Sequence, residues 1–399
     1  MGWLCRRAKR GLWRCIVALP PLWIFLCAVH LLPDDLMFES KSLPRQPLIL
    51  YWTKFYDNDF NRRQHLYQEA VRGLRNCPLN NCVITGNRSL LNQSSAVIFH
   101  VRDMRWDILP AYRDPQQYYV FHLLESPPHT VTSLASLAPG FFNLTFTYRL
   151  DSDIVANSYF QHYKPPMWTD WSSFEETWRV KTKLAVAFVS NCITPSRRNL
   201  VLEELREYIA IDVYGKCGPL KCNPTSTKKK AACNGLVSTY KFFLAFENSV
   251  CRDYVTEKIH RAYAQNTVPV VLGGANYTAL FPPNSFINIR DFPSAKALAE
   301  HLLFLSTNSA AYQTYFEWKL NPVYATLPSA LHERQISWCK LCQIINEPER
   351  KRMIKWNLEE WWHTMGQCIQ PLVSVLPEGK LRWVWLPQTS PPAPQVLHL

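Results

Sequence analysis

The chain has 399 residues, a formal net charge of +13 and 13 cysteines. So many cysteines are unusual in a cytosolic enzyme, and the ordinary proportions of apolar and charged residues exclude a disordered chain or a repeat array. The basic excess is typical of a solvated surface, and the alternative is a protein that meets an anionic ligand or an acidic membrane.

The N-terminus has the pattern of a membrane signal. Five basic residues within residues 1–14 precede an uncharged apolar stretch, residues 15–32. The stretch is short for a spanning helix and contains Pro20 and Pro21, so a cleaved signal peptide is the alternative. No small-residue cleavage site follows it, which favours a cytosolic tail (1–14), a retained transmembrane signal anchor (15–32) and a polar stem (33–47).

The remaining chain would then be lumenal and long enough for two domains. Ten of the cysteines follow the anchor, where disulfides are permitted. Glycosylation of the lumenal part is predicted at four N-x-S/T sequons. These are Asn87, Asn92, Asn143 and Asn276.

Residues 48–170 predict a first α/β domain, because the strand-like runs PLILYW, AVIFHV and YYVFHLLE alternate with polar stretches that can form helices. A loop rich in proline and tryptophan, YKPPMWTDWSSFEETW, separates this domain from a second one, residues 180–330. The second domain begins with the strand-like run KLAVAFVSN, and the pattern NLVLEELREYIA predicts a helix after it.

Later in the second domain the sequence predicts a βαβ unit. YKFFLAFEN is typical of a strand, DYVTEKIHRAYAQ predicts a helix opened by Asp253 as N-cap, and VPVVLGG is typical of a buried parallel strand. On that helix Tyr254, Glu257 and Lys258 would share one face in the first turn.

A helix start beside the carboxyl ends of strands favours a phosphate-bearing ligand. Lys258 would neutralise charge, Tyr254 would bond an oxygen and Glu257 would accept from hydroxyls, a set that suits a nucleotide diphosphate with attached sugars. The alternative is a surface Glu–Lys pair beside a packed tyrosine, and no glycine-rich fingerprint decides between the two.

The segment FENSVCRDYVTEK, residues 246–258, resembles the signature of the α1,3-fucosyltransferases, F-E-N-S-x-x-x-D-Y-[IV]-T-E-K. Other motifs follow in the family's order: ESP (125–127), FTYRLDSDI (146–154), VSN (189–191), VPVVLG (268–273) and WCKLC (338–342). The resemblance covers roughly residues 48–345. Within the family, the sequence looks most like the invertebrate and plant branches. The resemblance implies an α/β fold of GT-B architecture, in which two Rossmann-like domains face a cleft: an N-terminal acceptor domain and a C-terminal GDP-fucose domain.

The resemblance further implies GDP-fucose as donor, a GlcNAc-containing glycan as acceptor and inversion at the anomeric carbon. Glu125 matches the family's proposed general base, and Arg198 and Lys258 match its diphosphate-binding cations, with Arg197 as a neighbouring candidate. The donor pocket would also include Asn191, Asn248, Tyr254 and Glu257.

The DSD sequence, Asp151 to Asp153, resembles the metal-binding D-x-D of another glycosyltransferase fold. Because members of the resembled family hold the diphosphate with side-chain cations and a helix end, no obligatory metal is expected, although Mn²⁺ could stimulate the reaction. Leu150 stands where many relatives have an arginine, so the contacts of that arginine are absent.

In relatives, the cysteines that match Cys339 and Cys342 bridge back to the N-terminal domain. The resemblance therefore implies Cys77–Cys339 and Cys82–Cys342 bonds, or the exchanged pairing, and a segment 331–365 that returns to that domain. WNLEEWW (356–362) resembles the family's terminal segment, whereas LRWVWLPQTSPPAPQVLHL (381–399) has no recognised counterpart, and residues 366–399 are predicted to be a disordered tail. Five cysteines in the donor domain leave one free or bonded to Cys368: Cys192, Cys217, Cys222, Cys233 and Cys251.

Together these features predict a single-pass type II enzyme of the Golgi membrane, with a lumenal catalytic part and no nucleic-acid partner. It would transfer fucose to the O3 hydroxyl of GlcNAc, either in a Lewis-type N-acetyllactosamine or in the core of an N-glycan. Transfer to a peptide hydroxyl and an inactive, lectin-like relative are the alternatives. The intact set of Glu125, Arg198, Glu257 and Lys258 argues against inactivity.

Overall fold

The computed structural model describes residues 4–7, 13–16, 46–61, 64–130, 134–137, 139–156, 166–222, 233, 235–325, 334–347, 357–375 and 381–387. The chain divides into two compact units, Met1–Arg45 and Gln46–Leu399. In the first unit, β1 (Leu4–Arg7) pairs antiparallel with β2 (Trp13–Ile16). Apart from the two residues that end β2, the predicted anchor lies outside the described residues. No helix within the described ranges has the length and apolar character needed to span a bilayer.

The N-terminal half of the larger unit contains a six-stranded sheet in the order β4-β3-β5-β6-β7-β8. All its neighbouring strands are parallel. The central strands β5 and β6 are buried along their whole length, as expected for parallel strands covered on both faces. The strands are β3 (Leu48–Tyr51), β4 (Val83–Thr85), β5 (Ala96–His100), β6 (Tyr118–Leu123), β7 (Leu144–Thr147) and β8 (Ile154–Val155).

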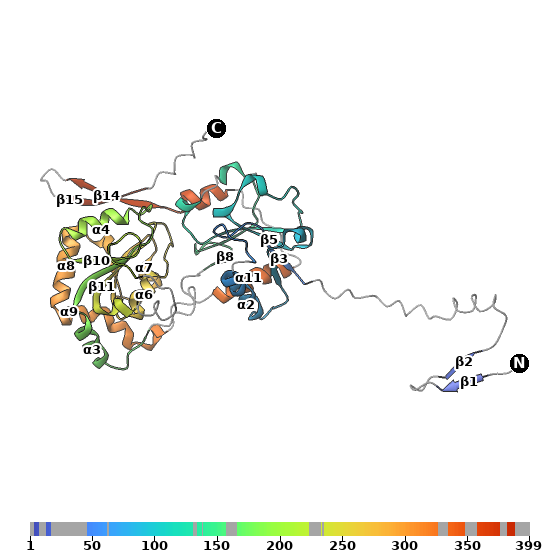
Figure 1. The fold of residues 1–399 in the computed structure, drawn as a ribbon, viewed down its shortest axis with the longest axis horizontal. Coiled ribbons are helices and arrows are strands. Elements are labelled where there is room, and N and C mark those ends of the chain that lie inside the picture. The colour runs from blue at the N-terminus through green and yellow to red at the C-terminus, as the bar shows by residue number, and fades with distance from the viewer. Residues whose placement is uncertain are drawn as a thin grey trace. The chain divides into compact units, whose positions relative to one another are not determined.

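A second parallel sheet follows in the order β10-β9-β11-β12-β13. Figure 1 shows each of the two sheets with helices of its own, so the prediction of an α/β chain built on two parallel sheets is confirmed. The strands are β9 (Lys183–Phe188), β10 (Ile211–Tyr214), β11 (Tyr240–Phe246), β12 (Val268–Leu272) and β13 (Ile287–Asn288).

The helices cover the sheets with apolar side chains. At the N-terminus of α8 (Ala295–Thr307), for example, Ser294 caps the helix by accepting a hydrogen bond from the Ala297 N–H, and the buried face of α8 is aliphatic. The α-helices are α2 (Gln64–Arg75), α3 (Ser172–Val180), α4 (Arg198–Arg206), α6 (Lys258–Ala264), α7 (Tyr277–Leu280), α8 (Ala295–Thr307), α9 (Ser309–Gln313) and α11 (Arg334–Asn346).

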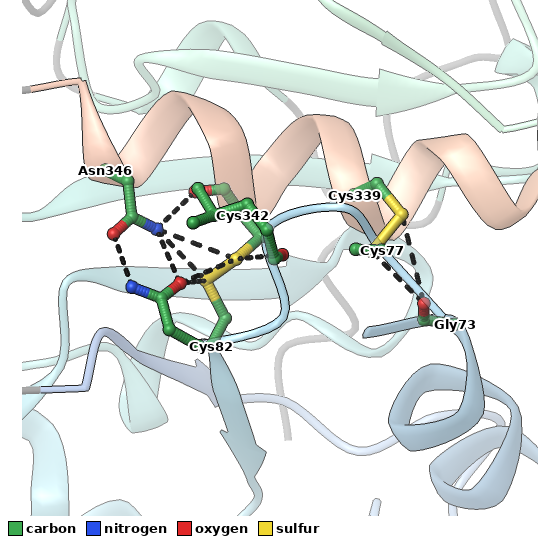
Figure 2. Close-up of a disulfide and its surroundings, with 8 residues drawn as sticks. Gly73, Cys77, Cys82, Cys339, Cys342 and Asn346 are labelled. Carbon is green, nitrogen blue, oxygen red and sulfur yellow. Dashed lines mark hydrogen bonds between the residues drawn. A yellow bond between two sulfur atoms is a disulfide. The ribbon is translucent and has the colours of Figure 1, made fainter. Parts of the chain in front are cut away.

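Helix α11, which follows the second sheet in the sequence, packs back on α2 and β8 of the N-terminal half (Figure 1). Gly73 allows the close approach, because a Cβ there would lie 2.9 Å from the Trp338 ring. Figure 2 shows the two disulfides that join α11 to the segment after α2. They are Cys77–Cys339 and Cys82–Cys342, the first of the two pairings that the resemblance implied.

The predicted disordered tail is wrong for residues 369–375 and 381–387, which form an antiparallel hairpin of β14 (Ile369–Val375) and β15 (Leu381–Pro387). Trp383 fixes the hairpin to the donor half. It is buried, its indole N–H donates to the Glu204 carboxylate of α4 at 2.6 Å, and its backbone N–H donates to the Pro293 carbonyl at 2.9 Å. A buried tryptophan with its N–H satisfied accounts for order in a segment whose composition did not indicate a core.

Three further disulfides use the remaining cysteines beyond residue 45. Cys251, in the signature segment, is bonded to Cys368, which was one of the two alternatives for the unpaired cysteine. The other two bonds are Cys192–Cys217 and Cys222–Cys233.

Candidate active site

The signature segment leaves β11 as an extended loop and not as a helix. Helix α6 begins at Lys258, five residues after Asp253, so the predicted helix start was wrong. Asp253 has a left-handed φ of 62°, and its carboxylate accepts from the backbone N–H of Leu150 at 3.2 Å instead of capping a helix. Tyr254 and Glu257 therefore precede the helix and do not share a helical face with Lys258.

Glu247 organises this loop, a role that the sequence analysis missed. Its buried carboxylate accepts from the backbone N–H and the hydroxyl of Thr256, at 2.8 and 2.7 Å, and from Lys258 Nζ at 2.7 Å. These contacts close the loop back on the end of β11 and hold the ammonium of Lys258 at a fixed place. The only signal in the sequence was a glutamate directly after a buried strand.

Arg198 is the first residue of α4 and reaches back toward β11. Its guanidinium donates to the carbonyls of Phe246 and Asn191, each at 2.9 Å. Burial lowers the pKa of Arg198, yet the group stays charged at neutral pH. Among the described residues, nothing accepts a hydrogen bond from its buried Nε. A cation with an unused donor at the end of a sheet is suited to an anionic ligand.

A cavity of about 380 Å³ opens at the carboxyl ends of β9 and β11, where ligands bind in open α/β sheets. Gly215 permits the close loop at its wall: its φ is 108°, and a Cβ there would lie 2.6 Å from the Val189 carbonyl oxygen. The lining residues are Phe188, Ser190, Asn191, Arg198, Gly215, Cys222, Cys233, Asn248, Glu257, Lys258 and Arg261.

The lining includes five of the six predicted donor-pocket residues, and of the two neighbouring arginines it includes Arg198. It also contains Arg261, which the sequence analysis missed although it follows Lys258 by three residues on α6 and so lies on the same face. Burial lowers the pKa of Arg261, whose Cζ lies 5.0 Å from the centre of the Phe188 ring. Three cations against two carboxylates, Glu257 in the lining and Glu247 bonded to Lys258, leave the cavity with a positive balance that suits a phosphate group.

Tyr254 lies elsewhere than predicted. It is not among the cavity-lining residues, it is buried, and its ring packs edge-to-face on Tyr148 with centroids 5.0 Å apart. Its hydroxyl donates to Glu125 Oε2 at 2.9 Å. The predicted bond from Tyr254 to a phosphate oxygen is therefore not supported by this geometry.

Glu125 follows β6 and contacts the loop between β11 and α6 through Tyr254. Besides Tyr254, the hydroxyl of Tyr56 donates to its Oε1 at 3.2 Å, and its side chain is 17% exposed. The next residue, Ser126, hydrogen bonds through its hydroxyl to Ser249 at 2.6 Å, and Ser249 is adjacent to the cavity residue Asn248. The chain next to Glu125 is thus hydrogen bonded to the segment that lines the cavity, and the Glu125 carboxylate is partly open to solvent.

His129 is the other titratable group beside Glu125. It belongs to the 3-10 turn Pro127–His129, and its Nδ1 lies 4.0 Å from Glu125 Oε2 and 3.0 Å from the Ser126 hydroxyl. Burial lowers the pKa of His129, so the imidazole is neutral at physiological pH and adds no positive charge next to the carboxylate.

The two carboxylates of the DSD sequence have structural partners. Asp151 pairs with the buried Arg149, whose Nε and Nη2 donate at 2.9 and 2.6 Å. Asp153 accepts from the backbone N–H and the hydroxyl of Thr145, at 2.8 and 2.7 Å. Within the described ranges, no group of three or more His, Cys, Asp or Glu side chains is arranged to hold a metal ion.

The four predicted glycosylation sites differ in exposure. Asn87, Asn92 and Asn276 are exposed, whereas Asn143 is only 3% exposed. The Asn143 side chain accepts from the Tyr119 backbone N–H at 2.8 Å and from Arg113 at 2.7 Å. This packing leaves no room for a glycan on Asn143, so we expect none on the folded chain.

Comparison with known proteins gives two family matches that together span most of the larger unit. The model described as "Fucosyltransferase, N-terminal" matches residues 44–159, and "Glycosyltransferase family 10 (fucosyltransferase) C-term" matches residues 178–361. Among the curated relatives is alpha-(1,3)-fucosyltransferase C of Drosophila melanogaster, which is 33% identical over 79% of this chain and 77% of its own length. Alpha-(1,3)-fucosyltransferase fut-1 of Caenorhabditis elegans is 31% identical over 86% of this chain and 77% of its own length.

A crystal structure of an alpha1,3-fucosyltransferase with GDP-fucose has the same fold. The TM-score is 0.51 at 18% sequence identity, and the match covers 79% of this chain and 94% of that one. The family matches and the curated relatives agree with the motifs around the cavity, and the resemblance noted in the sequence is confirmed: the chain belongs to glycosyltransferase family 10, the fucosyltransferases.

Proposed function

We propose that this family 10 enzyme transfers fucose from GDP-fucose to the O3 hydroxyl of a GlcNAc residue, with inversion at the anomeric carbon. The observation that supports the proposal is a cavity lined by three cations, to which Glu125 is linked through the hydrogen bond between Ser126, the next residue, and Ser249, the neighbour of the lining residue Asn248. The curated relatives are named for α1,3 transfer, which supports the linkage.

The donor half of the reaction uses the cavity. Lys258 and Arg198 bind the diphosphate and neutralise the charge that develops as GDP departs, with Arg261 as a third cation. Lys258 is already fixed by Glu247, so little reorganisation is needed when the donor binds. The asparagine side chains of Asn191 and Asn248 offer amide donors and acceptors to the donor.

Glu257 is the one carboxylate of the lining, and it accepts hydrogen bonds from ribose or fucose hydroxyls. It faces the same cavity as the three cations, so the sugar hydroxyls and the diphosphate are recognised by opposite charges within one site. This arrangement favours a nucleotide sugar over a free nucleotide or a free sugar.

On the acceptor side, Glu125 accepts the proton of the GlcNAc hydroxyl as its oxygen forms a bond to the anomeric carbon of fucose. The bond between that carbon and the diphosphate oxygen breaks in the same step, and the electron pair leaves with GDP. A single displacement of this kind inverts the configuration. The proposal assigns no metal to the step, and the DSD carboxylates have other partners.

We also propose that the enzyme is a type II protein of the Golgi membrane with its catalytic part in the lumen. The basic N-terminus followed by an apolar run supports this, as do the five disulfides beyond residue 45. Protease protection of the catalytic part in sealed Golgi vesicles is the expected result. Digestion of that part without detergent would contradict it.

The test of function is an acceptor panel. The purified lumenal part is incubated with GDP-fucose and, separately, with N-acetyllactosamine, an N-glycan core and a Ser/Thr peptide, and both GDP release and the product linkage are measured. We expect GDP release with at least one glycan and fucose on O3 of its GlcNAc. Fucose on the peptide alone would overturn the proposal. An enzyme that binds GDP but releases none from GDP-fucose with any acceptor would also overturn it.

A further inference from the structure

The carboxylate of Glu125 receives one phenol hydroxyl on each of its oxygens. Tyr56, which lies between β3 and α2 in the N-terminal half, donates to Oε1 at 3.2 Å, and Tyr254 of the donor half donates to Oε2 at 2.9 Å. A carboxylate oxygen has two lone pairs, so each keeps one for an acceptor hydroxyl. The two phenols restrict rotation of a side chain that would otherwise be partly free at a solvent-exposed edge.

Tyr56 reaches this position from an unusual turn. The turn is closed by two backbone hydrogen bonds between Phe55 and Asn58, at 2.8 and 3.3 Å. Tyr56 and Asp57 both have left-handed backbone conformations, with φ of 48° and 61°. Two consecutive non-glycine residues in this region are uncommon and persist only where surrounding contacts impose the conformation.

Asp103 supplies those contacts. Its carboxylate accepts the backbone N–H of Tyr56 at 2.7 Å and that of Asp57 at 3.0 Å. The Asp103 carboxylate is itself held by the Nδ1 of His100, 2.5 Å away, and His100 is fully buried at the end of β5. Two successive N–H groups around one anion form an anion-binding concavity of the kind called a nest. The turn is thus anchored to the central sheet.

The phenol is fixed in both orientation and protonation. The Tyr56 ring packs edge-to-face on Phe55, with centroids 4.8 Å apart, and the guanidinium carbon of Arg102 lies 5.3 Å from its centre. Burial, together with the negative charge of Glu125, raises the pKa of Tyr56 far above its usual value. The hydroxyl therefore remains protonated and available as a donor at neutral pH.

We propose that Tyr56, held in its turn by Asp103, is a positioning residue that aims the Glu125 carboxylate at the acceptor hydroxyl. The inference rests on the proposed role of Glu125 as the base. Tyr56 is not among the cavity-lining residues, so it affects proton transfer and not donor binding. Without its phenol, the carboxylate is held on one oxygen only and spends less time in the productive orientation.

The experiment compares Tyr56→Phe with Tyr112→Phe, a tyrosine of the same half that is 66% exposed. Steady-state rates are measured for donor and acceptor over a range of pH. For Tyr56→Phe we expect kcat to fall about 10- to 100-fold, the range for losing a hydrogen bond to a charged group, with an unchanged KM for GDP-fucose. Tyr112→Phe leaves both constants unchanged.

The pH profile gives a second readout. A phenol that donates to a carboxylate favours its ionised form, so without it the acid limb of kcat moves to higher pH. Among the described residues, the charged or titratable groups that act on Glu125 include Tyr56, Tyr254, His129, His100, Tyr148 and, over the Tyr56 ring, Arg102; of these, Tyr56→Phe changes only the first. A loss that was merely structural would lower the amount of active enzyme without moving the limb.

Asp103→Asn tests the anchor of the turn, with Asp107→Asn as its control. Asp107 is an exposed aspartate four residues later that pairs with Arg105 on the surface. The two N–H groups bond different oxygens of Asp103, and in Asp103→Asn one of these atoms becomes an NH2 donor. One of the two hydrogen bonds is therefore lost in this geometry, and kcat should fall in the same way as for Tyr56→Phe. Asp107→Asn should behave like the wild type.

Glu125→Gln distinguishes a failure of the positioning role of Tyr56 from a failure of the proposed base, Glu125. If Glu125→Gln is inactive while Tyr56→Phe keeps the wild-type kcat and pH profile, the positioning role is overturned and the base survives. A higher KM for the acceptor at constant kcat would also overturn it, because Tyr56 would then be an acceptor contact. If Glu125→Gln is itself active, the proposed base is wrong and this inference is overturned with it.

Discussion

Replacing Lys258 by alanine removes a cation from the donor cavity and from a buried ion pair at the same time. Lys258 Nζ lies 2.7 Å from Glu247 Oε2, and the side chains are 14% and 2% exposed. Breaking a buried pair costs about 3–5 kcal/mol, but two donors from Thr256 remain on Glu247, so we expect a loss of about 1–3 kcal/mol in unfolding free energy. The loss of transition-state stabilisation should be about 2–4 kcal/mol, or roughly a 30- to 1,000-fold fall in kcat/KM.

The two effects can be separated with a second substitution. In the double variant Glu247→Gln, Lys258→Ala the unpaired buried charge is removed, so part of the stability should return while the activity does not. Urea unfolding measures the first quantity and GDP release the second. Lys296→Ala is the matched control, because Lys296 pairs with Glu300 at 3.8 Å on the surface and should change neither. Near-normal activity in Lys258→Ala, or recovery of activity in the double variant, would refute a role in holding the diphosphate.

Four further outcomes are expected. Arg198→Lys should lower kcat/KM about 100-fold, because a single ammonium cannot replace a guanidinium that bonds the Phe246 and Asn191 carbonyls and still offers Nε to a ligand; normal kinetics would contradict this. Mass spectrometry of the protein purified from a eukaryotic host should find glycan on some of Asn87, Asn92 and Asn276 and none on Asn143, and a glycan on Asn143 of active enzyme would show that its burial is wrong. Serine at both Cys251 and Cys368 should lower the unfolding free energy by about 2–4 kcal/mol in urea, and an unchanged midpoint would argue against this bond. Burial lowers the pKa of Lys319 to about 7, so the buried charge destabilises the wild type fully below pH 7 and less as pH rises toward the usual lysine pKa. Lys319→Met lacks this charge, so the difference in unfolding free energy between the variant and the wild type should narrow from pH 7 to pH 9. A constant difference would contradict this.

Regular hydrophobic patterns predicted the sheets well. The runs YKFFLAFEN and VPVVLGG became the adjacent parallel strands β11 and β12, because a strand buried on both faces has to be apolar along its whole length. The family motifs also assigned Lys258, Arg198 and Asn191 to one donor pocket, and the three residues line the same cavity. The position of a buried strand and the residue types that follow it can be read from local sequence, whereas the order of the strands in each sheet cannot.

The differences arise where tertiary contacts override local preference. Asp253 is a residue type that often caps helices, yet its carboxylate accepts a hydrogen bond from the backbone N–H of Leu150, which is distant in sequence. The helix starts later, at Lys258. Asn143 lies in a sequon, but its side-chain oxygen accepts a hydrogen bond from the backbone N–H of Tyr119 near the start of β6. The hairpin residue Trp383 finds its partner Glu204 in a helix far away in the chain, which no local pattern reports.

The same limit explains why Tyr56 and Glu247 were missed. A tyrosine in the run KFYDND carries no periodic signal, and its importance appears only when the turn, the Asp103 carboxylate and Glu125 meet in space. Glu247 stood inside the signature itself, but its role depends on Thr256 and Lys258 returning to it.

The most direct test of the account is the activity of Glu125→Gln together with its affinity for GDP. The amide keeps the size of the side chain but cannot take a proton, and the cations of the donor cavity are untouched. We predict that calorimetry finds the wild-type Kd for GDP while fucose transfer falls by about 100-fold or more. Transfer at the wild-type rate by a variant that binds GDP normally would show that another group accepts the proton.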